Sequence, residues 1–498
     1  MSDQKSRSIT LNNLSLQPCI DKLTAAVLAD EKQLQKFASA TSLRQQVQIL
    51  LKTFSHKPKV TIREAVFEIV KELSRFGDRD ESKSEELAEE SKMLGSKAFS
   101  QRLDAEALHL YNEALHLCPD CSPNLPLLYA NRSAVLFHMK KYQECLDDIN
   151  RALDSQYPKN LKHKVLVRRA QCLQLLGRNR EASIAVQQAR ALCEDLAPAK
   201  TRDSYFSTLE ALRVQFRDAQ ISTVAPELDE RDLAVGVKTS LLHDETTKLD
   251  GLNDEMTDAL NDYKRQILKY KLFKGSNPQI NFMSNALEMR EDAIEGRHVV
   301  SKRAIKAGST LFIERPFAYM LLPKFHSTYC YNCITFLKDI PIPCKNCRIV
   351  VFCSAACRSQ AHPWHRLDCC RLTLTSAGGM AQLALRAVAV AGWPVCSAVM
   401  KESPDAGSDE KYNKYTPIAR YRALYRLVHH IDKSPVEEQI QYCLASIILA
   451  TALQNKLEAL NPSATLASDK PRTGRLPEGW GTLDEVAALL FRHIGQLV

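Results

Sequence analysis

The chain has 498 residues, of which 45% are hydrophobic and 25% are charged, a composition typical of globular domains. This mixture excludes a chain that is disordered throughout, a collagen and a coiled-coil rod, and the length predicts about two to four domains. The formal net charge of +9 is small for this length and does not indicate a nucleic-acid-binding protein.

Signals for membranes and secretion are weak. The most apolar stretches, residues 387–400 and 442–453, are shorter than the roughly 18 residues that a membrane-spanning helix needs. Residues 1–10 are polar and lack the apolar core of a secretory signal. We therefore predict no membrane association and a location in the cytoplasm and nucleus.

Residues 1–87 are predicted to form a packed helical region without chemistry of its own. Apolar side chains recur there at helical spacing, as in Leu23, Val27, Leu34, Phe37, Val47 and Leu51.

Residues 88–196 contain three copies of an internal repeat, whose starts lie 37–38 residues apart. Small residues at repeat positions 8 and 20 let two antiparallel helices approach closely, and position 24 fills the groove between neighbouring pairs. This pattern resembles the tetratricopeptide repeat. Positions 8, 20, 24 and 27 hold Gly95, Ala107, Tyr111 and Ala114, then Ser133, Cys145, Ile149 and Ala152, then Ala170, Ala182, Val186 and Ala189.

The rest of the chain outside the cysteine cluster alternates between linker, strand and helix. Residues 197–285, with acidic runs at 227–232 and 244–258, predict a solvated helical linker. Apolar residues around Lys306–Ser309 predict a β-hairpin within 296–322, in a region bounded by 286–329. Residues 370–498 return to helical spacing after a polar loop at 401–414. On one expected helix lie Tyr421, Leu424, Tyr425, Val428 and Ile431.

Eight of the 16 cysteines lie between residues 330 and 370. In a reducing compartment such a dense cluster indicates metal ligands rather than disulfides. Four ligand pairs are enough for two tetrahedral zinc ions, and short links between the pairs favour an interleaved arrangement. The predicted ligand sets are Cys330, Cys333, Cys353 and Cys357 for one ion, and Cys344, Cys347, His365 and Cys369 for the other.

Two choices support these sets. His362 lies seven residues before Cys369, which is the wrong spacing for one helical face, so His365 is preferred. The alternative, a set of buried free cysteines, fits this ligand spacing poorly. Both zinc ions are predicted to be structural because no coordination position stays open. Basic residues within 324–372 balance the anionic zinc–thiolate centres, so protein binding ranks above DNA binding.

The zinc pattern resembles a MYND finger at 330–369. Three tetratricopeptide units before it, a hairpin bearing Gly296-Arg297-His298 and helices after it resemble the tetratricopeptide-bearing branch of the SET and MYND domain-containing protein family. The resemblance implies a relative of S-adenosylmethionine-dependent protein-lysine methyltransferases. It also implies a finger inserted in a SET domain, with Gly296, Arg297 and His298 at the cofactor. For Gly296 the alternative is an ordinary turn glycine.

The chain departs from this family at the active site. A SET domain uses a later Asn-His segment and a C-terminal tyrosine, and no Asn-His dipeptide occurs here. We therefore expect a chain that is truncated before the catalytic core, has no catalytic residues of its own and does not bind S-adenosylmethionine tightly. Residues 370–498 are expected to fold only in part.

The repeats also resemble those that grip the acidic C-terminal tails of heat-shock chaperones with a clamp of basic and amide side chains. Serine replaces the first asparagine of that pattern, which removes an amide donor. The five positions hold Lys92, Ser96, Asn131, Lys164 and Arg168. The alternative for these residues is an ordinary solvated helix surface.

The sequence thus predicts a multi-domain, mainly α protein with tetratricopeptide repeats, a partial SET hairpin, a two-zinc MYND finger and a helical C-terminal segment. Two functions stay open. One is a protein-lysine methyltransferase with a lysine-bearing protein substrate. The other is a non-catalytic adaptor whose repeats bind chaperone tails and whose finger binds proline-containing peptides.

Overall fold

The computed structural model describes residues 16–53, 61–194, 203, 205–211, 213, 271–337, 340–371, 378–402, 416–460 and 479–497. The chain divides into two compact units. One contains residues 81–245 and 326–358, and the other contains residues 1–80, 246–325 and 359–498. Both acidic runs predicted in the linker, and most of the polar loop at 401–414, lie outside the described residues.

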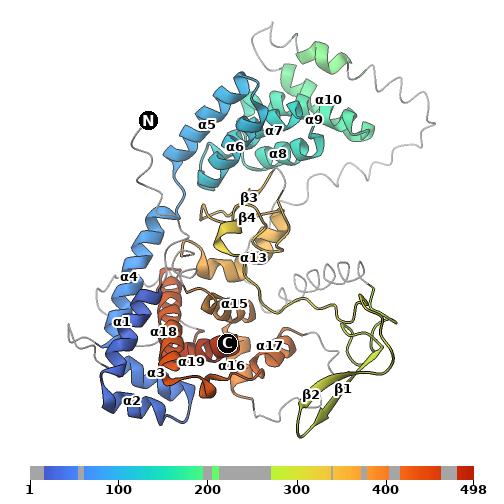
Figure 1. The fold of residues 1–498 in the computed structure, drawn as a ribbon. Coiled ribbons are helices and arrows are strands. Elements are labelled where there is room, and N and C mark those ends of the chain that lie inside the picture. Colours follow the sequence, from blue (N-terminus) through green and yellow to red (C-terminus); the bar gives the residue numbers. More distant parts are fainter. Residues whose placement is uncertain are drawn as a thin grey trace. The chain divides into compact units, whose positions relative to one another are not determined.

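Three helix pairs stack side by side in the first unit, which confirms the predicted tetratricopeptide repeats (Figure 1). The pairs are α5 (Glu85–Ser100) with α6 (Asp104–Leu117), α7 (Leu125–His138) with α8 (Tyr142–Asp154), and α9 (Lys162–Leu175) with α10 (Asn179–Glu194). The turn inside each pair contains one residue in the left-handed region, namely Arg102, Lys140 and Gly177, with φ of 62°, 60° and 73°. These equivalent turns bring the second helix of each pair back against the first.

Small residues set the distance between paired helices, as the sequence predicts. Gly95 on α5 faces the ring of Tyr111 on α6, and a Cβ atom at Gly95 would lie 3.1 Å from that ring. The residues at positions 8, 20, 24 and 27 of all three units are buried. The repeat core therefore follows the sequence pattern closely.

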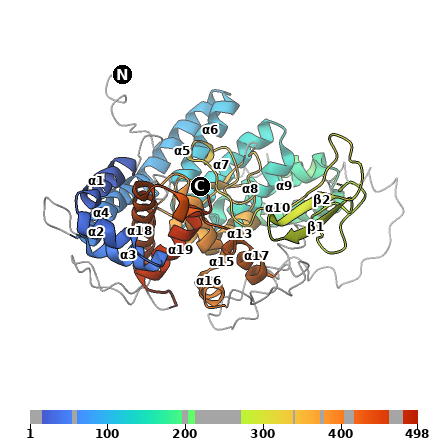
Figure 2. The ribbon, with the colours of Figure 1, turned by 60° about the horizontal axis from the view of Figure 1, so that its bottom comes forward.

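The second unit is built on a helical core drawn from both ends of the chain. Its N-terminal helices are α1 (Gln17–Leu28), α2 (Glu31–Ala38), α3 (Leu43–Lys52) and α4 (Ile62–Asp80). Its C-terminal helices are α15 (Ala381–Ala391), α16 (Trp393–Met400), α17 (Pro417–Tyr425), α18 (Val436–Ala459) and α19 (Leu483–Gly495). Figures 1 and 2 show α18 beside α1, α4 and α19. Phe37 and Val47 share one buried cluster with Ile448 and Leu490.

In the described part of the chain no single helix is long and apolar enough to cross a membrane. The helices α15 and α16 reach that length and composition only together, and they meet at a bend of 96°.

The structure places the β-hairpin earlier in the chain than predicted. Strand β1 (Leu287–Asp292) pairs antiparallel with β2 (Gly296–Ser301), from Leu287 opposite Ser301 to Asp292 opposite Gly296. The carboxylate of Asp292 accepts hydrogen bonds from the Ile294 and Glu295 amides at 2.9 and 2.7 Å, and Gly296 has a φ of 64°, so this turn closes tightly.

Gly308 also lies in a turn, with a φ of 80°, but the segments beside it do not pair with each other. The backbone after this turn bonds to an earlier segment instead, because Ser284 donates to Leu311 at 2.8 Å and Ile313 donates to Phe282 at 2.9 Å. The prediction of a hairpin around 306–309 is therefore wrong. Residues 271–285 are irregular rather than helical, so that part of the linker prediction is also wrong.

The predicted helix through residues 421–431 ends early. Helix α17 stops at Tyr425, and Val428 is 69% exposed. Side chains of α19 and of the residue after it bind the free carbonyl groups there. Arg492 Nε donates to Tyr425 O at 2.9 Å, and Gln496 Nε2 donates to Leu427 O at 2.8 Å. These bonds replace the next helical turn.

Candidate functional site

The finger is a small module of two short strands and one helix. Strand β3 (Ile342–Pro343) pairs antiparallel with β4 (Val351–Phe352), and α13 (Ala355–Asp368) follows. The two-residue spacing of each early cysteine pair places its thiols on a turn. In the later pairs, Cys353 directly follows β4, Cys357 and His365 lie on α13, and Cys369 directly follows that helix. The local structure thus converts the sequence spacing into converging ligands.

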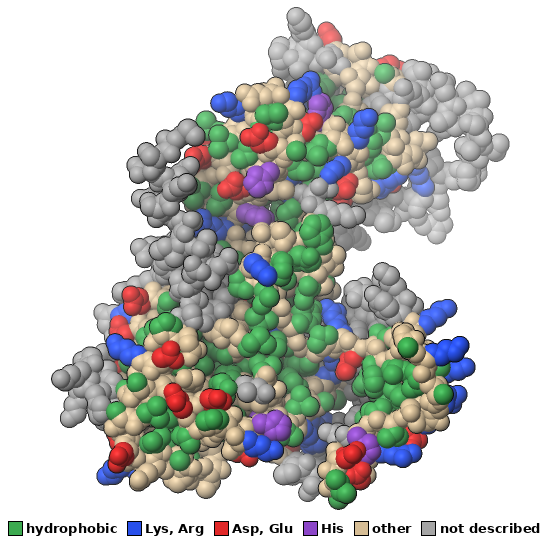
Figure 3. All heavy atoms as spheres, in the orientation of Figure 1, with side chains coloured by type: hydrophobic (Ala, Val, Ile, Leu, Met, Phe, Trp, Pro, Cys, Tyr) green, Lys and Arg blue, Asp and Glu red, His purple; other side chains and the backbone are tan. Residues whose placement is uncertain are grey.

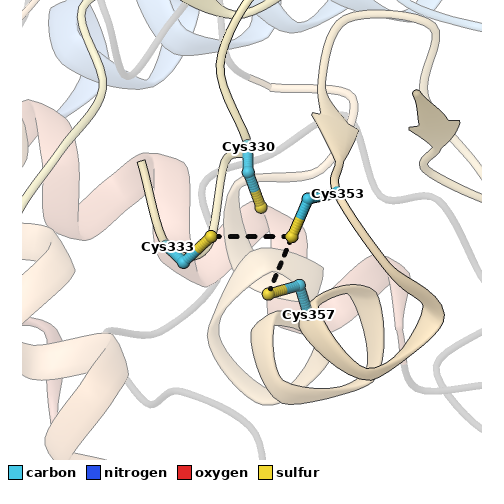
Figure 4. Close-up of side chains that lie close together, drawn as sticks. All are labelled: Cys330, Cys333, Cys353 and Cys357. Carbon is cyan, nitrogen blue, oxygen red and sulfur yellow. Dashed lines mark hydrogen bonds between the residues drawn. The ribbon is translucent and has the colours of Figure 1, made fainter. Parts of the chain in front are cut away.

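Four sulfur atoms meet at one end of the finger (Figure 4). Cys333 Sγ lies 3.6 Å from Cys353 Sγ, which in turn lies 3.5 Å from Cys357 Sγ. Cys330 comes from the loop before Cys333 and points to the same centre (Figure 4). All four ligand atoms lie within 4.8 Å of one another, and Cys353 is exposed while Cys330 is buried. A tetrahedral zinc ion with four thiolate ligands fits this donor set.

The second predicted set also forms one group. The ligand atoms of Cys344, Cys347, His365 and Cys369 lie within 4.8 Å of one another, and all four residues are buried. His362, the rejected alternative, is exposed on α13 and belongs to neither group. Cys370, which the predicted sets also leave out, has its sulfur 4.0 Å from that of Cys369. Both groups have the membership given by the sequence argument.

The thiols in the first group affect each other's protonation. The neighbouring sulfur of Cys333 raises the pKa of Cys330, and the hydrogen bond from Cys330 lowers the pKa of Cys333. Burial raises the pKa of Cys353 to about 12. Zinc binds thiolates, so metal binding releases these protons. Since four protein ligands complete a tetrahedron, the chemistry available here is structural, with no position for a substrate.

Gly296, Arg297 and His298 begin strand β2, directly after the turn of the hairpin. His298 Nδ1 lies 3.1 Å from Gly296 O, 3.6 Å from Asp292 and 3.8 Å from Glu295. On the face drawn in Figure 3, acidic, basic and histidine side chains gather at this end of the hairpin. The near neighbours of His298 are therefore polar.

The five candidate clamp residues lie on the first helices of the three pairs: Lys92 and Ser96 on α5, Asn131 on α7, and Lys164 and Arg168 on α9. Lys92 Nζ lies 2.6 Å from Glu89 and donates to Asn124 at 3.0 Å. Ser96 Oγ donates to Lys92 O at 2.9 Å and lies 3.0 Å from the Tyr111 hydroxyl. Lys164 is exposed and Asn131 is half-buried.

Sequence reasoning missed two buried arginines near the site. Arg132 is fully buried, donates to both oxygens of Asp148 at 2.6 and 2.8 Å, and lies 3.4 Å from Pro341 O of the finger. Arg386 on α15 donates to Asp368, the residue before the last zinc ligand, at 3.0 Å. Asp368 lies three residues after His365, and residues at this spacing are neighbours on a helix. The sequence therefore contained a signal for the contact between Asp368 and His365.

Comparison with protein families finds a MYND finger at residues 330–369, the predicted bounds. The chain is 25% identical to the protein-lysine N-methyltransferase SMYD4 of Gallus gallus, over 81% of this chain and 57% of that protein. It is 24% identical to SMYD4 of Homo sapiens, over 81% of this chain and 53% of that protein.

A shorter match lies with the Hsp70/Hsp90 co-chaperone CNS1 of Saccharomyces cerevisiae, which is 36% identical over 16% of this chain and 21% of that protein. Among solved structures, the Sgt2 TPR domain of Aspergillus fumigatus aligns with 30% of this chain and 92% of its own, at 18% identity and a TM-score of 0.24.

The chain spans a little over half the length of the curated SMYD4 relatives that it matches. The similarity nevertheless runs along most of this chain, through regions on both sides of the finger. Together, the MYND finger and the SMYD4 matches support a chain that is similar to SMYD4, a SET and MYND protein.

Proposed function

We propose that this chain is the recognition portion of an SMYD4-like protein and that its repeats bind an acidic C-terminal peptide tail of the kind found on heat-shock chaperones. The observation that carries the proposal is the state of Arg168. Its Nη1 atom donates to Ala130 O at 3.1 Å and to Ser133 Oγ at 2.7 Å, which fixes the guanidinium between α9 and α7.

Burial lowers the pKa of Arg168, yet arginine stays protonated in proteins, so the fold holds a desolvated cation there. Among the described residues, no acidic side chain forms an ion pair with it. A buried cation without an anion is unfavourable. A carboxylate from a ligand would supply the missing charge and accept bonds from the guanidinium.

Lys164 lies four residues before Arg168 and therefore on the same face of α9. Its side chain is exposed and is available to a second carboxylate. Asn131 on α7 offers an amide as a further donor. On α5, the pairing of Lys92 with Glu89 must be replaced when a ligand binds, and Ser96 lacks an amide donor. We therefore expect binding that is weaker than a complete five-residue clamp gives.

The test is calorimetry of the full chain with a synthetic peptide that ends in an acidic tail with a free carboxylate. We expect Lys164→Ala to weaken binding at least about tenfold, since a charge-assisted hydrogen bond is lost. Ser96→Asn should tighten it by restoring the amide. The matched control is Lys97→Ala, an exposed lysine on α5 outside the five positions. The clamp would be refuted if Lys164→Ala bound the peptide as tightly as the wild type does, and if the wild type bound an amidated peptide as tightly as the peptide with a free carboxylate.

Methyl transfer to protein lysine is the second candidate function, since the SMYD4 relatives are named as protein-lysine N-methyltransferases. We propose it for the SMYD4-like protein as a whole, with a lysine-bearing protein as substrate and S-adenosylmethionine as methyl donor. Residues Gly296, Arg297 and His298 would be this chain's contribution to the cofactor site. Positioning of cofactor and amine supplies much of the rate in such reactions.

For this chain we expect no tight cofactor binding, since it contains no Asn-His segment to close the site. Calorimetry with S-adenosylmethionine checks this, and a micromolar Kd would contradict it.

As an adaptor, the chain would also use its finger to bind proline-containing peptides, and we propose that it works in the cytoplasm and nucleus.

A further inference from the structure

We propose that Asp368 and Arg386 are positioning residues for zinc: together they fix the orientation and tautomer of the ligand His365. The argument rests on contacts among α13, the residues after it and α15. It goes beyond the peptide-binding role above and does not depend on it.

The first step concerns the tautomer of His365. Its Nδ1 atom lies 2.6 Å from Asp368 Oδ1, and both side chains are at most 8% exposed. An ionised carboxylate only accepts hydrogen bonds, so Nδ1 must carry the proton and donate it. The lone pair of Nε2 is then left for the metal. Because both residues lie on one turn of α13, the imidazole cannot rotate without breaking this bond.

The second step concerns what holds Asp368. Arg386 Nη2 on α15 donates to Asp368 Oδ2 at 3.0 Å, so the two carboxylate oxygens bind two different partners. The guanidinium of Arg386 also lies over the ring of Trp364, 3.7 Å from its centroid. Arg386 is 4% exposed, and its neighbours Leu385 and Val388 belong to the helical core. The core of this unit therefore anchors the carboxylate.

The third step is a comparison of energies. A buried ion pair often contributes little net stability, because both charges lose their hydration. The presence of the Asp368–Arg386 pair is therefore explained better by its effect on the imidazole of His365 than by a gain in stability. A carboxylate bonded to the distal nitrogen raises the basicity of a histidine ligand, and losing such a partner typically costs about 10–100-fold in metal affinity.

The experiment uses the full chain loaded with zinc and a chromophoric chelator that reports the release of each ion. We expect Asp368→Asn to weaken one bound zinc at least about tenfold and to leave the other unchanged. Arg386→Met should weaken the same ion, whereas Arg386→Lys, which keeps a cation beside Asp368, should restore much of the affinity. In the double variant, Arg386→Met should add nothing to Asp368→Asn, because Arg386 acts through Asp368.

A second readout is the absorption spectrum after replacement of zinc by Co²⁺, in which a site with one imidazole and three thiolates differs from a site with four thiolates. We expect Asp368→Asn to change only the imidazole-containing component. The matched control is Glu402→Gln, which breaks the Arg422–Glu402 pair, 2.6 Å apart, in the same unit without touching a ligand.

Two results would overturn the proposal. One is wild-type release of both ions from Asp368→Asn. The other is equal weakening of both ions, which would indicate a general loss of fold. If Asp368→Asn does not fold, the comparison of Arg386→Met with Arg386→Lys decides, and equal zinc affinities in those two variants would count against a positioning role.

Discussion

The imidazole of His493 on α19 faces α17 and is 3% exposed. Its Nε2 atom lies 2.9 Å from the Tyr421 hydroxyl on α17, and its Nδ1 atom lies 2.8 Å from Gln496 Oε1. The amide oxygen accepts, so Nδ1 carries the proton and Nε2 accepts from the tyrosine. The site is built for the neutral ring.

Burial lowers the pKa of His493 from 6.5 to about 4. A depressed pKa means that its stabilising contribution is complete above pH 6.5 and is lost as the pH falls toward 4. Between pH 7 and pH 5 we expect the wild type to lose roughly 2 kcal/mol through this residue. Urea unfolding of His493→Gln at both pH values should show a smaller loss. His430→Gln, at an exposed histidine, should behave like the wild type, and equal losses in all three proteins would contradict the assignment.

At the scale of single residues, the metal site was the most predictable part of the molecule. Cysteine and histidine spacing alone assigned eight ligands to two groups, because each pair is local and the links between pairs are short. The anchoring residue Arg386 was not predictable from spacing. It reaches Asp368 from a helix 18 positions along the chain, and such a contact depends on packing.

At the scale of elements, the repeats test how closely two helices must approach. Gly95→Val would place side-chain atoms against the Tyr111 ring, where even a Cβ atom lies 3.1 Å away. We expect a loss of about 2 kcal/mol in unfolding free energy, since overpacking and a β-branched residue both act there. Lys97→Val makes the same change at an exposed position of the same helix. If Gly95→Val melted at the same temperature as Lys97→Val, the contact between Gly95 and Tyr111 would tolerate a larger side chain, and the prediction would be wrong.

Elements with strong periodicity were predicted well, and irregular ones were not. The repeat helices follow a pattern that the sequence repeats three times. The hairpin was predicted in the wrong place because the turn at Gly308 was taken for the hairpin turn. Gly308 does lie in a turn, but the two strands pair on either side of the turn between Asp292 and Gly296. In that region turn residues are plentiful, and the pairing partner depends on longer-range contacts such as Ser284 with Leu311. Local sequence signals do not contain that choice.

At the scale of the whole molecule, each unit is assembled from segments that are distant in sequence. Residues 1–87 and 370–498 were predicted as separate regions, yet described residues of both share one core around α18. Polar contacts also join the N-terminal and C-terminal helices of this core. For example, Arg44 Nε on α3 lies 2.7 Å from Asp484 Oδ2 on α19. The expectation that the C-terminal helices fold only in part did not foresee that α1, α3 and α4 pack against α18 and that α3 packs against α19. Amphipathic patterns show that a face is buried but not against what.

The central claim is that eight cysteine and histidine ligands hold two structural zinc ions in the finger, and metal analysis of the purified full chain tests it most directly. We predict two zinc ions per polypeptide, with one lost from Cys353→Ser and the other from Cys344→Ser. Fewer than two ions in the wild type, or no loss from either variant, would contradict the account.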